Sequence, residues 1–465
     1  MGPNARPETD VSDDAANAPP PVAELRRRVA RDMPAARAEL ERLVRIPSVA
    51  FPGFPDEPLR RAAAAVADLL RDAGLDDVRL LDVPASPQAV FGERPSQPGA
   101  PTVLLYAHYD VQPAGVAADW RSPPFEPVER EGRLYGRGAA DDKSGIVVHA
   151  AALRVLGAAR LGVKVLIEGA EETGQGDLEE LVRARPDLVA ADAVVICDSG
   201  NHALGRPTLT TSLRGMAKLT VEVRTLSGPV HSGMYGGPAP DALLALIAML
   251  ATLHDPAGNV AVEGLGSFDY EGGGYDEPAF RRDAGVLAGV ALAGSASIAE
   301  QLYGRPAITV IGIDAPAVEG APNAVVPRAR AALGVRVAPG HDPRAARDAV
   351  VRHLKAVAPR RAVLGFSDAG TGEGFLAATD GPAYAAATRA LAAAYGRPVS
   401  FYGQGGSIPL VAAFSAAAPG AELILWGAEE PQSKVHGLDE SVDLGELERC
   451  ILAEALFLAE LAATE

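Results

Sequence analysis

The sequence predicts an α/β fold, in which a mainly parallel β-sheet is covered by helices on both faces and a smaller α+β domain is inserted in the chain. Two observations predict this fold. Apolar segments of strand length alternate with helical segments from about residue 25, as in proteins with parallel sheets. Near residue 210 the strands begin to alternate apolar and polar residues, and the first pattern resumes near residue 381.

The larger domain contains helices marked by apolar residues at helical spacing and strands marked by short apolar runs. Pro47 follows the first helix and Gly74 closes the second. The expected helices cover residues 22–46, 59–74, 144–159, 177–185, 381–395 and 443–462. The expected strands cover residues 78–83, 102–107, 163–170, 192–198 and 421–427.

The inserted domain is expected to be a small α+β unit. Its strands cover 217–224, 307–314 and 328–337, and its helices cover 238–253 and 343–357. The stretch 264–300 is rich in Gly and Ala and has no clear period. The expected organisation is a disordered tail over 1–24, the larger domain over 25–210 and 377–465, and the inserted domain over 211–376.

The overall composition excludes some classes of function. The chain has 465 residues, of which 48% are hydrophobic and 22% are charged, so each of two domains can hold a real core. The net charge of −17 argues against general nucleic-acid binding, which needs a basic stripe, and against binding to anionic membrane surfaces. We therefore expect neither nucleic acid nor a membrane as a partner.

The two cysteines, Cys197 and Cys450, do not form a disulfide framework and fit a reducing compartment. No stretch reaches 18 uncharged apolar residues, so we expect no transmembrane helix. The first 25 residues are polar, acidic and rich in Pro and Ala, which is typical of a disordered tail rather than a signal peptide. The expected location is cytoplasmic.

The stretch "TVLLYAHYDV" (102–111) ends an apolar strand on His108 and Asp110. Residues two apart in a strand point to the same face, so both side chains can aim at one point beyond the strand end. This geometry suits a metal ion, and it suits an ordinary His–Asp hydrogen bond equally well.

The stretch "LYGRGAADDKSG" (134–145) brings two aspartates directly after a glycine loop. It is not a dinucleotide fingerprint, because Asp141 occupies the place of the third glycine, and it is not a phosphate loop, because no glycine precedes Lys143. Asp141 and Asp142 can ligate a cation or cap the helix that follows, and both roles can hold at once.

Two further acidic groups follow expected strands. Glu171 and Glu172 stand in "EGAEETG", where adjacent carboxylates repel one another unless a cation lies between them, although such pairs are often idle on a solvated loop. Asp198 ends the run "VVICD", and His436 stands in a loop before the last helix. Imidazole and carboxylate donors without thiolate suit two zinc ions, or manganese or cobalt, sharing a carboxylate. The candidate donors are His108, Asp110, Asp141, Glu172, Asp198 and His436.

At these residues the sequence resembles the co-catalytic metallopeptidases that include carnosine-type cytosolic dipeptidases, carboxypeptidase G and acetylornithine deacetylase. The matching stretches span nearly the whole chain and are "YAHYDVQP", "WRSPPFEP", "LYGRGAADDKSG", "EGAEETG", "CDSG", "HSGMYGG", "PNAVVPRARAALGVRV" and "GQGGSIP". The resemblance implies two divalent metal ions per subunit, a small peptide substrate, and a homodimer formed through the inserted domain, which serves as a lid.

The resemblance also assigns roles to the residues of the larger, catalytic domain. It implies that His108, Asp141 and Asp198 hold one metal ion, that Asp141 bridges both ions, and that Glu172 and His436 complete the other site. Glu171 would be the general base, and Asp110 would orient His108. Family members have a cis peptide bond between the residues that match Asp141 and Asp142.

Further residues match those that hold the substrate in the family. His231 matches a histidine that reaches into the partner's active site and holds the substrate carbonyl oxygen, although it could simply be a turn residue. Asn323 and Arg336 match lid residues that hold the carboxylate end of the substrate, although Arg336 could be a surface strand residue. Ser407 matches a residue of the substrate-binding loop.

Asp198 indicates which reaction to expect, because dipeptidases of the family usually have Asp there and deacylases more often have Glu. The resemblance therefore favours hydrolysis of dipeptides through a water activated by the metal ions and Glu171. Three alternatives remain: an N-acyl amino acid deacylase or carboxypeptidase, a non-catalytic binding homologue, and, remotely, a nucleotide-binding α/β protein.

Overall fold

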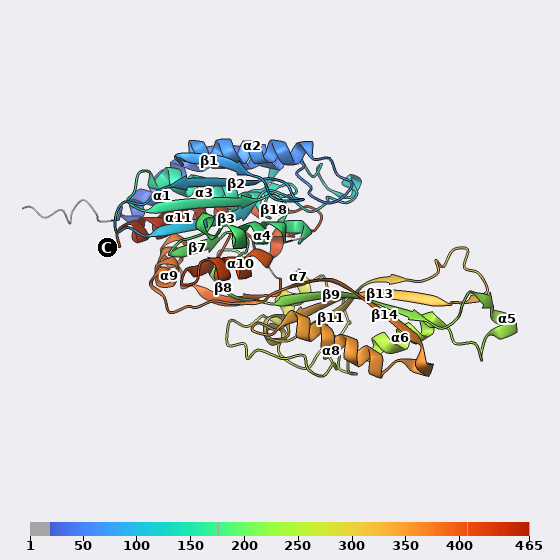
Figure 1. Cartoon of the computed structure of the whole chain (residues 1–465). Coiled ribbons are helices and arrows are strands. Elements are labelled where there is room, and N and C mark those ends of the chain that lie inside the picture. Colours follow the sequence, from blue (N-terminus) through green and yellow to red (C-terminus); the bar gives the residue numbers. More distant parts are fainter. Residues whose placement is uncertain (1–18, 175, 407, 465) are drawn as a thin grey trace, which may run out of the picture. The chain divides into compact units, whose positions relative to one another are not determined.

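A computed structural model of the chain describes residues 19–174, 176–406 and 408–464 (Figure 1). The chain forms two compact units. The first comprises Met1–Thr208, Thr379–Val399 and Ala417–Glu465, and the second comprises Leu209–Ala378 and Ser400–Ala416. Residues 1–18 of the expected tail lie outside the described residues, and the first helix begins at Val22.

A mainly parallel sheet forms the centre of the first unit. Its strand order is β1 (Asp77–Leu81), β2 (Ala89–Arg94), β6 (Gly162–Glu168), β3 (Thr102–His108), β7 (Ala193–Ile196) and β17 (Glu422–Leu425). The last four strands are parallel, whereas β1 and β2 pair antiparallel at one side. The predicted α/β fold is therefore confirmed, and the short strand β2 was missed because only its first half is clearly apolar.

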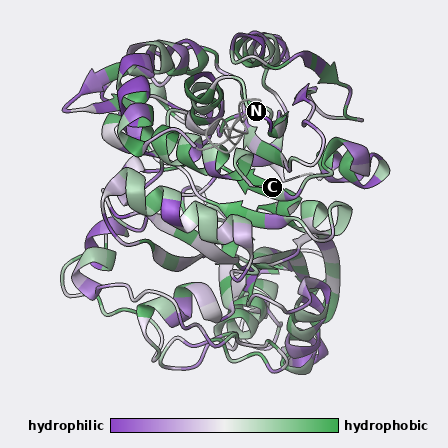
Figure 2. Ribbon diagram, turned by 90° about the vertical axis from the view of Figure 1, so that its left-hand side faces the viewer, coloured by the Kyte–Doolittle hydropathy of each residue, from purple (hydrophilic) through white to green (hydrophobic). Residues whose placement is uncertain are grey.

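Helices flank this sheet as the sequence predicted. They are α1 (Val22–Val44), α2 (Glu57–Asp72), α3 (Lys143–Leu156), α4 (Asp177–Ala184), α9 (Pro382–Tyr395) and α11 (Leu444–Ala462). Helix α11 packs against α1, α3 and α9, while α2 packs against β1 and β2. Hydrophobic residues run along the central strands and hydrophilic residues gather on the outer helices (Figure 2). Burial of this apolar surface is the main stabilising contribution to the unit.

A small antiparallel sheet joins two distant parts of the first unit. It pairs β18 (Ser441–Asp443) with β5 (Arg133–Tyr135), and β5 with β4 (Val128–Arg130). This pairing brings the loop before α11, which carries His436, next to the glycine loop that follows β5. Residues far apart in the sequence thus meet at one side of the main sheet.

The second unit is built on an antiparallel sheet with strand order β11 (Ala307–Asp314), β13 (Arg328–Val337), β9 (Gly215–Arg224) and β14 (Val363–Gly372). Along β9 and β13, buried and less buried residues alternate, so one face carries the core of the unit. Helices α6 (Ala242–Ala251) and α8 (Pro343–Ala356) cover that face. Strands β11 and β13 have the predicted bounds, and β14 was missed because its sequence has no regular period.

The second unit also contains shorter helices and strands. They are β8 (Thr208–Leu213), β10 (Val230–His231), α5 (Ser232–Tyr235), α7 (Glu277–Asp283), β12 (Ala324–Val325), β15 (Phe375–Leu376), β16 (Ser400–Gln404) and α10 (Pro409–Ala417). Residues Ser400–Ala416 belong to this unit, although they fall within the expected larger domain (377–465). The reason is that β16 pairs with β8.

The helices in the described part of the chain are too short or too polar to span a lipid bilayer.

Candidate metal centre

The carboxyl ends of three neighbouring parallel strands carry the predicted site residues of the first unit. His108 is the last residue of β3, Glu171 and Glu172 lie in the 3-10 turn after β6, and Asp198 follows β7 by two residues. Because β6, β3 and β7 are adjacent and parallel, these ends meet at one edge of the sheet. This edge is where α/β proteins commonly place their sites.

Asp141 lies between two histidines. Its Oδ1 is 3.0 Å from Nε2 of His108, and its Oδ2 is 3.0 Å from Nε2 of His436. Asp198 flanks the first histidine, with Oδ1 at 3.6 Å from His108 Nε2, and Glu172 flanks the second, with Oε2 at 3.1 Å from His436 Nε2. The structure thus brings together five predicted donors as two groups that share one carboxylate.

The hydrogen bonds of His108 fix which of its ring nitrogens carries the proton. Nδ1 is 3.1 Å from the carbonyl oxygen of Asp110, and a carbonyl can only accept, so Nδ1 is the donor. In the neutral ring Nε2 then carries a lone pair that faces carboxylate oxygens. This atom is buried and makes no hydrogen bond within the described part of the chain. A lone pair facing carboxylates is unfavourable unless a proton or a metal ion lies between them. Against the opposing effect of burial, the contacts with Asp110, Asp141 and Asp198 raise the pKa of His108 well above its usual value, so the site attracts positive charge and fits a metal ion.

The charges around the histidines also favour cations. Hydrogen bonds from His436 to Asp141 and Glu172 raise the pKa of its imidazole to about 11. Burial raises the pKa of Asp198 to about 6 and raises that of Glu171 well above its usual range, with Asp198 adding to the effect on Glu171. Carboxylates would stay ionised so close together only with positive charge among them.

Asp110 fixes the turn that carries the two glutamates. Its Oδ1 accepts the backbone N–H of Glu171 and its Oδ2 accepts that of Glu172, both at 3.1 Å. Its carboxylate also lies 3.4 Å from Nδ1 of His108. Because Asp110 is fully buried, these contacts link the ends of β3 and β6 directly.

The two aspartates of the glycine loop have different surroundings. The peptide bond between Asp141 and Asp142 is cis, as the resemblance implies. The Asp142 side chain accepts the N–H of Gly145 at the start of α3 and the N–H of His108. Asp142 is therefore the helix cap that the sequence allowed, while Asp141 faces the histidines.

Glu440 is a residue that sequence reasoning missed. Its Oε1 accepts the backbone N–H groups of Gly138, Ala140 and Asp141 at 3.0–3.1 Å, and its Oε2 pairs with Arg137 at 2.5 Å. Both side chains of this ion pair are buried. One carboxylate thus fixes the loop that carries Asp141, and the only signal in the sequence was the stretch "HGLDE", which begins at His436.

Two other residues at the centre were also missed. Gln112 donates from Nε2 to Oε2 of Glu172 at 2.8 Å, and it belongs to the stretch "YDVQP". Glu429 has a carboxylate oxygen within 4.8 Å of oxygens of Asp141 and Asp198. Its place follows from the contact of its carbonyl with the N–H of Asn201, which no local sequence pattern reveals.

The predicted lid residues lie in the second unit, and two of them are neighbours. His231 pairs with Ala324 in the short β10–β12 ladder, and the carbonyl of Asn323 accepts the N–H of Ser232 at 2.9 Å. The Nδ1 of His231 accepts the N–H of Gly233, so the turn role that the sequence allowed is present. Its imidazole is exposed and open to further contacts.

Arg336 lies in β13 between β11 and β9, beside Arg214. Burial lowers the pKa of both guanidinium groups. The pKa of Arg214 falls to about 10, and the positive charge of Arg336 contributes to this decrease. Ser407, the fourth predicted substrate-binding residue, lies outside the described residues.

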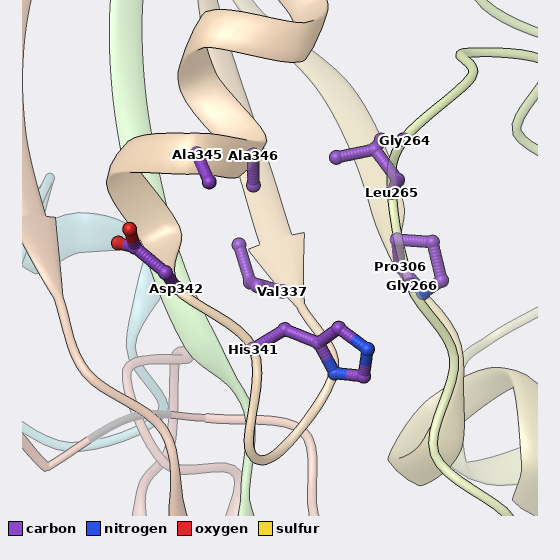
Figure 3. A pocket seen from close by; sticks show the side chains of 9 residues that line it. All are labelled: Gly264, Leu265, Gly266, Pro306, Val337, His341, Asp342, Ala345 and Ala346. Carbon is purple, nitrogen blue, oxygen red and sulfur yellow. The ribbon is translucent and has the colours of Figure 1, made fainter.

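A small cavity in the second unit contains none of the predicted site residues. Its volume is about 60 Å³, and it lies between the start of α8 and the segment around Leu265 (Figure 3). His341 and Asp342 are at its edge, and its other lining is mostly apolar. Nothing in its chemistry resembles the metal-type donor set of the first unit.

The chain is similar to known proteins over most of its length. A sequence model of peptidase family M20/M25/M40 matches residues 104–460. A cysteinylglycine-S-conjugate dipeptidase of Corynebacterium striatum is 43% identical over 405 residues, which cover 85% of this chain and 89% of that protein. The Cys-Gly metallodipeptidase dug1 of Schizosaccharomyces pombe is 27% identical, over 91% of this chain and 95% of its own length.

Solved structures share the fold. The crystal structure of human carnosine dipeptidase 1 superimposes with a TM-score of 0.83 at 25% identity, covering 96% of this chain and all of that one. The family match extends over more than half of the chain, and it confirms the resemblance drawn from the sequence motifs. The chain belongs to peptidase family M20/M25/M40.

Proposed function

We propose that this protein is a metal-dependent dipeptidase that hydrolyses the amide bond of dipeptides or short peptides with a free C-terminal carboxylate. The observation that carries the proposal is the position of Asp141, whose two oxygens face His108 and His436 at 3.0 Å each. Two adjacent groups of N and O donors that share a carboxylate suit a pair of divalent ions. The dipeptidases among the relatives support the same reaction.

Two divalent ions per subunit belong to the proposal, with Zn²⁺ as the first choice and Mn²⁺ or Co²⁺ as alternatives. His108, Asp141 and Asp198 would hold one ion. Asp141, Glu172 and His436 would hold the other. The chemistry that such ions supply when bound is Lewis-acid polarisation of a carbonyl and activation of water for attack.

Glu171 is the proposed general base. Asp110 accepts the backbone N–H of Glu171 at 3.1 Å and so fixes the turn that carries this side chain at the end of β6. Burial raises the pKa of Glu171, which suits a group that takes a proton from the attacking water and then returns it to the leaving amine. Asp110 is a positioning residue, since it holds both Glu171 and Glu172.

Residues of the second unit are proposed to hold the substrate. Arg336 is suited to the terminal carboxylate, because a guanidinium binds a carboxylate through two parallel hydrogen bonds. His231 and Asn323, neighbours on one side of that unit, are proposed for the carbonyl oxygen and the carboxylate end. Ser407 is proposed for the same subsite from the sequence resemblance alone.

A homodimer formed through the second unit is part of the proposal, with His231 acting in the partner's site. The support is an apolar surface on that unit. Leu244 and Ile247 on α6 are 68% and 48% exposed, and Ile311 and Ile313 on β11 are 56% and 48% exposed. Strand β11 is also at the edge of its sheet, where a second chain can pair or pack.

The alternatives are less well supported. An N-acyl amino acid deacylase or carboxypeptidase would use a similar centre, but the relatives with the highest identity reported above are dipeptidases. A non-catalytic homologue would not be expected to keep the five donors and Glu171 together. We also propose a cytoplasmic location, which fits the free thiols of Cys197 and Cys450.

The test is a substrate screen on protein reconstituted with Zn²⁺, Mn²⁺ or Co²⁺. We expect turnover of dipeptides, including cysteinylglycine and its S-conjugates, and little turnover of N-acetyl amino acids. A chelator should abolish the activity, and the His108→Ala variant should not regain it with added metal. Faster hydrolysis of N-acetyl amino acids than of any dipeptide would replace the proposal with the deacylase alternative.

A further inference from the structure

A second group of metal-type donors lies in the first unit, behind the candidate metal centre. It consists of His149 on α3, Cys197 directly after β7, and Glu454 on α11. One donor atom of each residue lies within 4.8 Å of the others, and all three side chains are buried. Three separate elements therefore converge on one point in the core.

The second cysteine of the chain belongs to the same cluster. Cys450 precedes Glu454 by four residues on α11, so both side chains lie on one face of the helix. Its thiol is within hydrogen-bond reach of the thiol of Cys197, and it is also buried. The only two cysteines of this chain thus meet beside an imidazole and a carboxylate.

The ring of His149 presents a lone pair to this cluster. Its Nε2 is 3.0 Å from the carbonyl oxygen of Tyr106, and a carbonyl can only accept, so Nε2 carries a hydrogen. In the neutral ring Nδ1 is then a bare acceptor, 2.8 Å from Oε1 of Glu454. Two lone pairs at that distance need a positive charge between them, which is either a proton or a metal ion.

Glu454 also has one oxygen without a partner. Its Oε2 makes no hydrogen bond with any described residue, although the side chain is fully buried. Leaving a buried carboxylate oxygen unsatisfied is unfavourable, and more so than for a neutral acceptor. A proton on His149 can bind only Oε1 of Glu454, whereas a metal ion in the cluster can be coordinated by either oxygen of this carboxylate.

We propose that His149, Cys197, Glu454 and Cys450 form a structural site for a thiophilic divalent ion, with Zn²⁺ as the chemical type. Structural zinc sites have four protein ligands, usually cysteine and histidine, and here the carboxylate of Glu454 would take one of the four positions. As ligands, the two thiolates and the carboxylate of Glu454 would carry three negative charges, so the site with a divalent ion would have one net negative charge, as in zinc sites with three cysteines and one histidine. Because the four side chains are buried, the site offers no position to a substrate.

An ion in this cluster would support the candidate metal centre from behind. Cys197 directly precedes Asp198, and the Tyr106 carbonyl that accepts from His149 lies two residues before His108. The ion would therefore link the ends of β3 and β7 to α3 and α11. Its role would be stabilisation, because an ion that binds only the folded chain lowers the free energy of that state.

The spectrum of cobalt can test this site separately from the proposed function. The candidate metal centre has only nitrogen and oxygen donors, so a thiolate-to-cobalt charge-transfer band can come only from the buried cluster. The full chain would be produced in zinc-depleted medium supplemented with Co²⁺, so that the ion enters during folding. We expect the near-ultraviolet charge-transfer band in the wild-type protein, whether or not the protein hydrolyses dipeptides.

Variants separate the two sites further. We expect Cys197→Ser and Cys450→Ser each to lose most of the band, and Cys197→Ser to lose one bound ion per chain. The matched control is His436→Ala, which should keep the band. A folded wild-type protein that binds Co²⁺ without any charge-transfer band would overturn the proposal and leave a protonated His149–Glu454 pair as the explanation. This wild-type result needs no variant to fold.

Discussion

The carboxylate of Glu440 accepts a hydrogen bond from the backbone N–H of Asp141 at 3.1 Å. The same oxygen accepts the N–H groups of Gly138 and Ala140, and the other oxygen pairs with Arg137. The position of Asp141 therefore depends on an acid that does not itself face the histidines. Groups behind metal ligands commonly tune metal affinity in this way.

We expect Glu440→Gln to weaken metal retention by about 10–100-fold, because the amide replaces an acceptor of three N–H groups with a poorer one. It also leaves Arg137 unpaired in a buried site, which should cost about 3–5 kcal/mol of unfolding free energy. Competition with a chelator and thermal unfolding measure the two effects. The control is Glu319→Gln, which removes the same charge from an exposed side chain of the second unit. Unchanged affinity in Glu440→Gln would show that the loop holds its shape without this acid.

The role proposed for Glu171 predicts a separation of metal binding from turnover. Glu171→Ala should keep the metal content of the wild type, because its side chain belongs to neither group of donors. Its kcat should fall by about 100-fold or more, the usual contribution of a general base. Elemental analysis and steady-state kinetics check the two parts, with the exposed Glu180→Ala as control. Activity within tenfold of the wild type would remove Glu171 as the base.

Glu168 predicts a pH dependence of stability. Burial raises its pKa to about 8 from 4.5, against the opposing hydrogen bond from Tyr106. Between these pH values the folded chain keeps a proton that the unfolded chain has lost, so this group makes the fold less stable as pH rises. Above about pH 8 its effect is constant.

The matched variant is Glu168→Gln, which keeps an acceptor for Tyr106 but cannot titrate. Its stability relative to the wild type should increase with pH by up to about 1.4 kcal/mol per unit across that window. Thermal unfolding of both proteins at pH 5, 6, 7 and 8 measures the difference. Parallel curves would mean that Glu168 titrates normally in the folded protein.

The exposed side chains of α6 predict an assembly. We expect the wild-type protein to sediment as a dimer, and Leu244→Glu with Ile247→Glu to sediment as a monomer, because charges in an apolar interface are costly. Val116→Glu changes a residue of the first unit that is 64% exposed, and it should leave the dimer intact. If the wild type is monomeric at micromolar concentration, the proposed role of His231 in a partner's site fails with it.

Part of the candidate donor set follows local sequence patterns, whereas the role of His436 was predicted through the family resemblance. An apolar strand ending in a polar residue predicts His108 and Asp198 at the sheet edge, and parallel pairing then brings these ends together. The helix-cap role of Asp142 also follows from its position before α3. Periodicity likewise predicts β11 and β13, whose strands are long and regular.

Other features depend on contacts that no local pattern encodes. Glu440 could not be recognised, because its partners are backbone N–H groups about 300 residues away. Residues 400–416 resemble any α/β segment, and only the pairing of β16 with β8 places them in the second unit. Strand β14 has many small and polar residues, so its pairing with β9 rather than its own sequence determines its conformation.

The order of the donors along the chain has a consequence for synthesis. Four of the five, from His108 to Asp198, lie in the first half of the sequence, but His436 arrives just before the final helix. A nascent chain therefore cannot assemble the shared centre before residue 436 has been translated. A chain that ends between β17 and residue 436 would keep the strands of the main sheet, but it would lack His436, β18 and the helix α11 that packs against α1, α3 and α9. The second half of the centre and the helix that completes the core of the unit therefore form together.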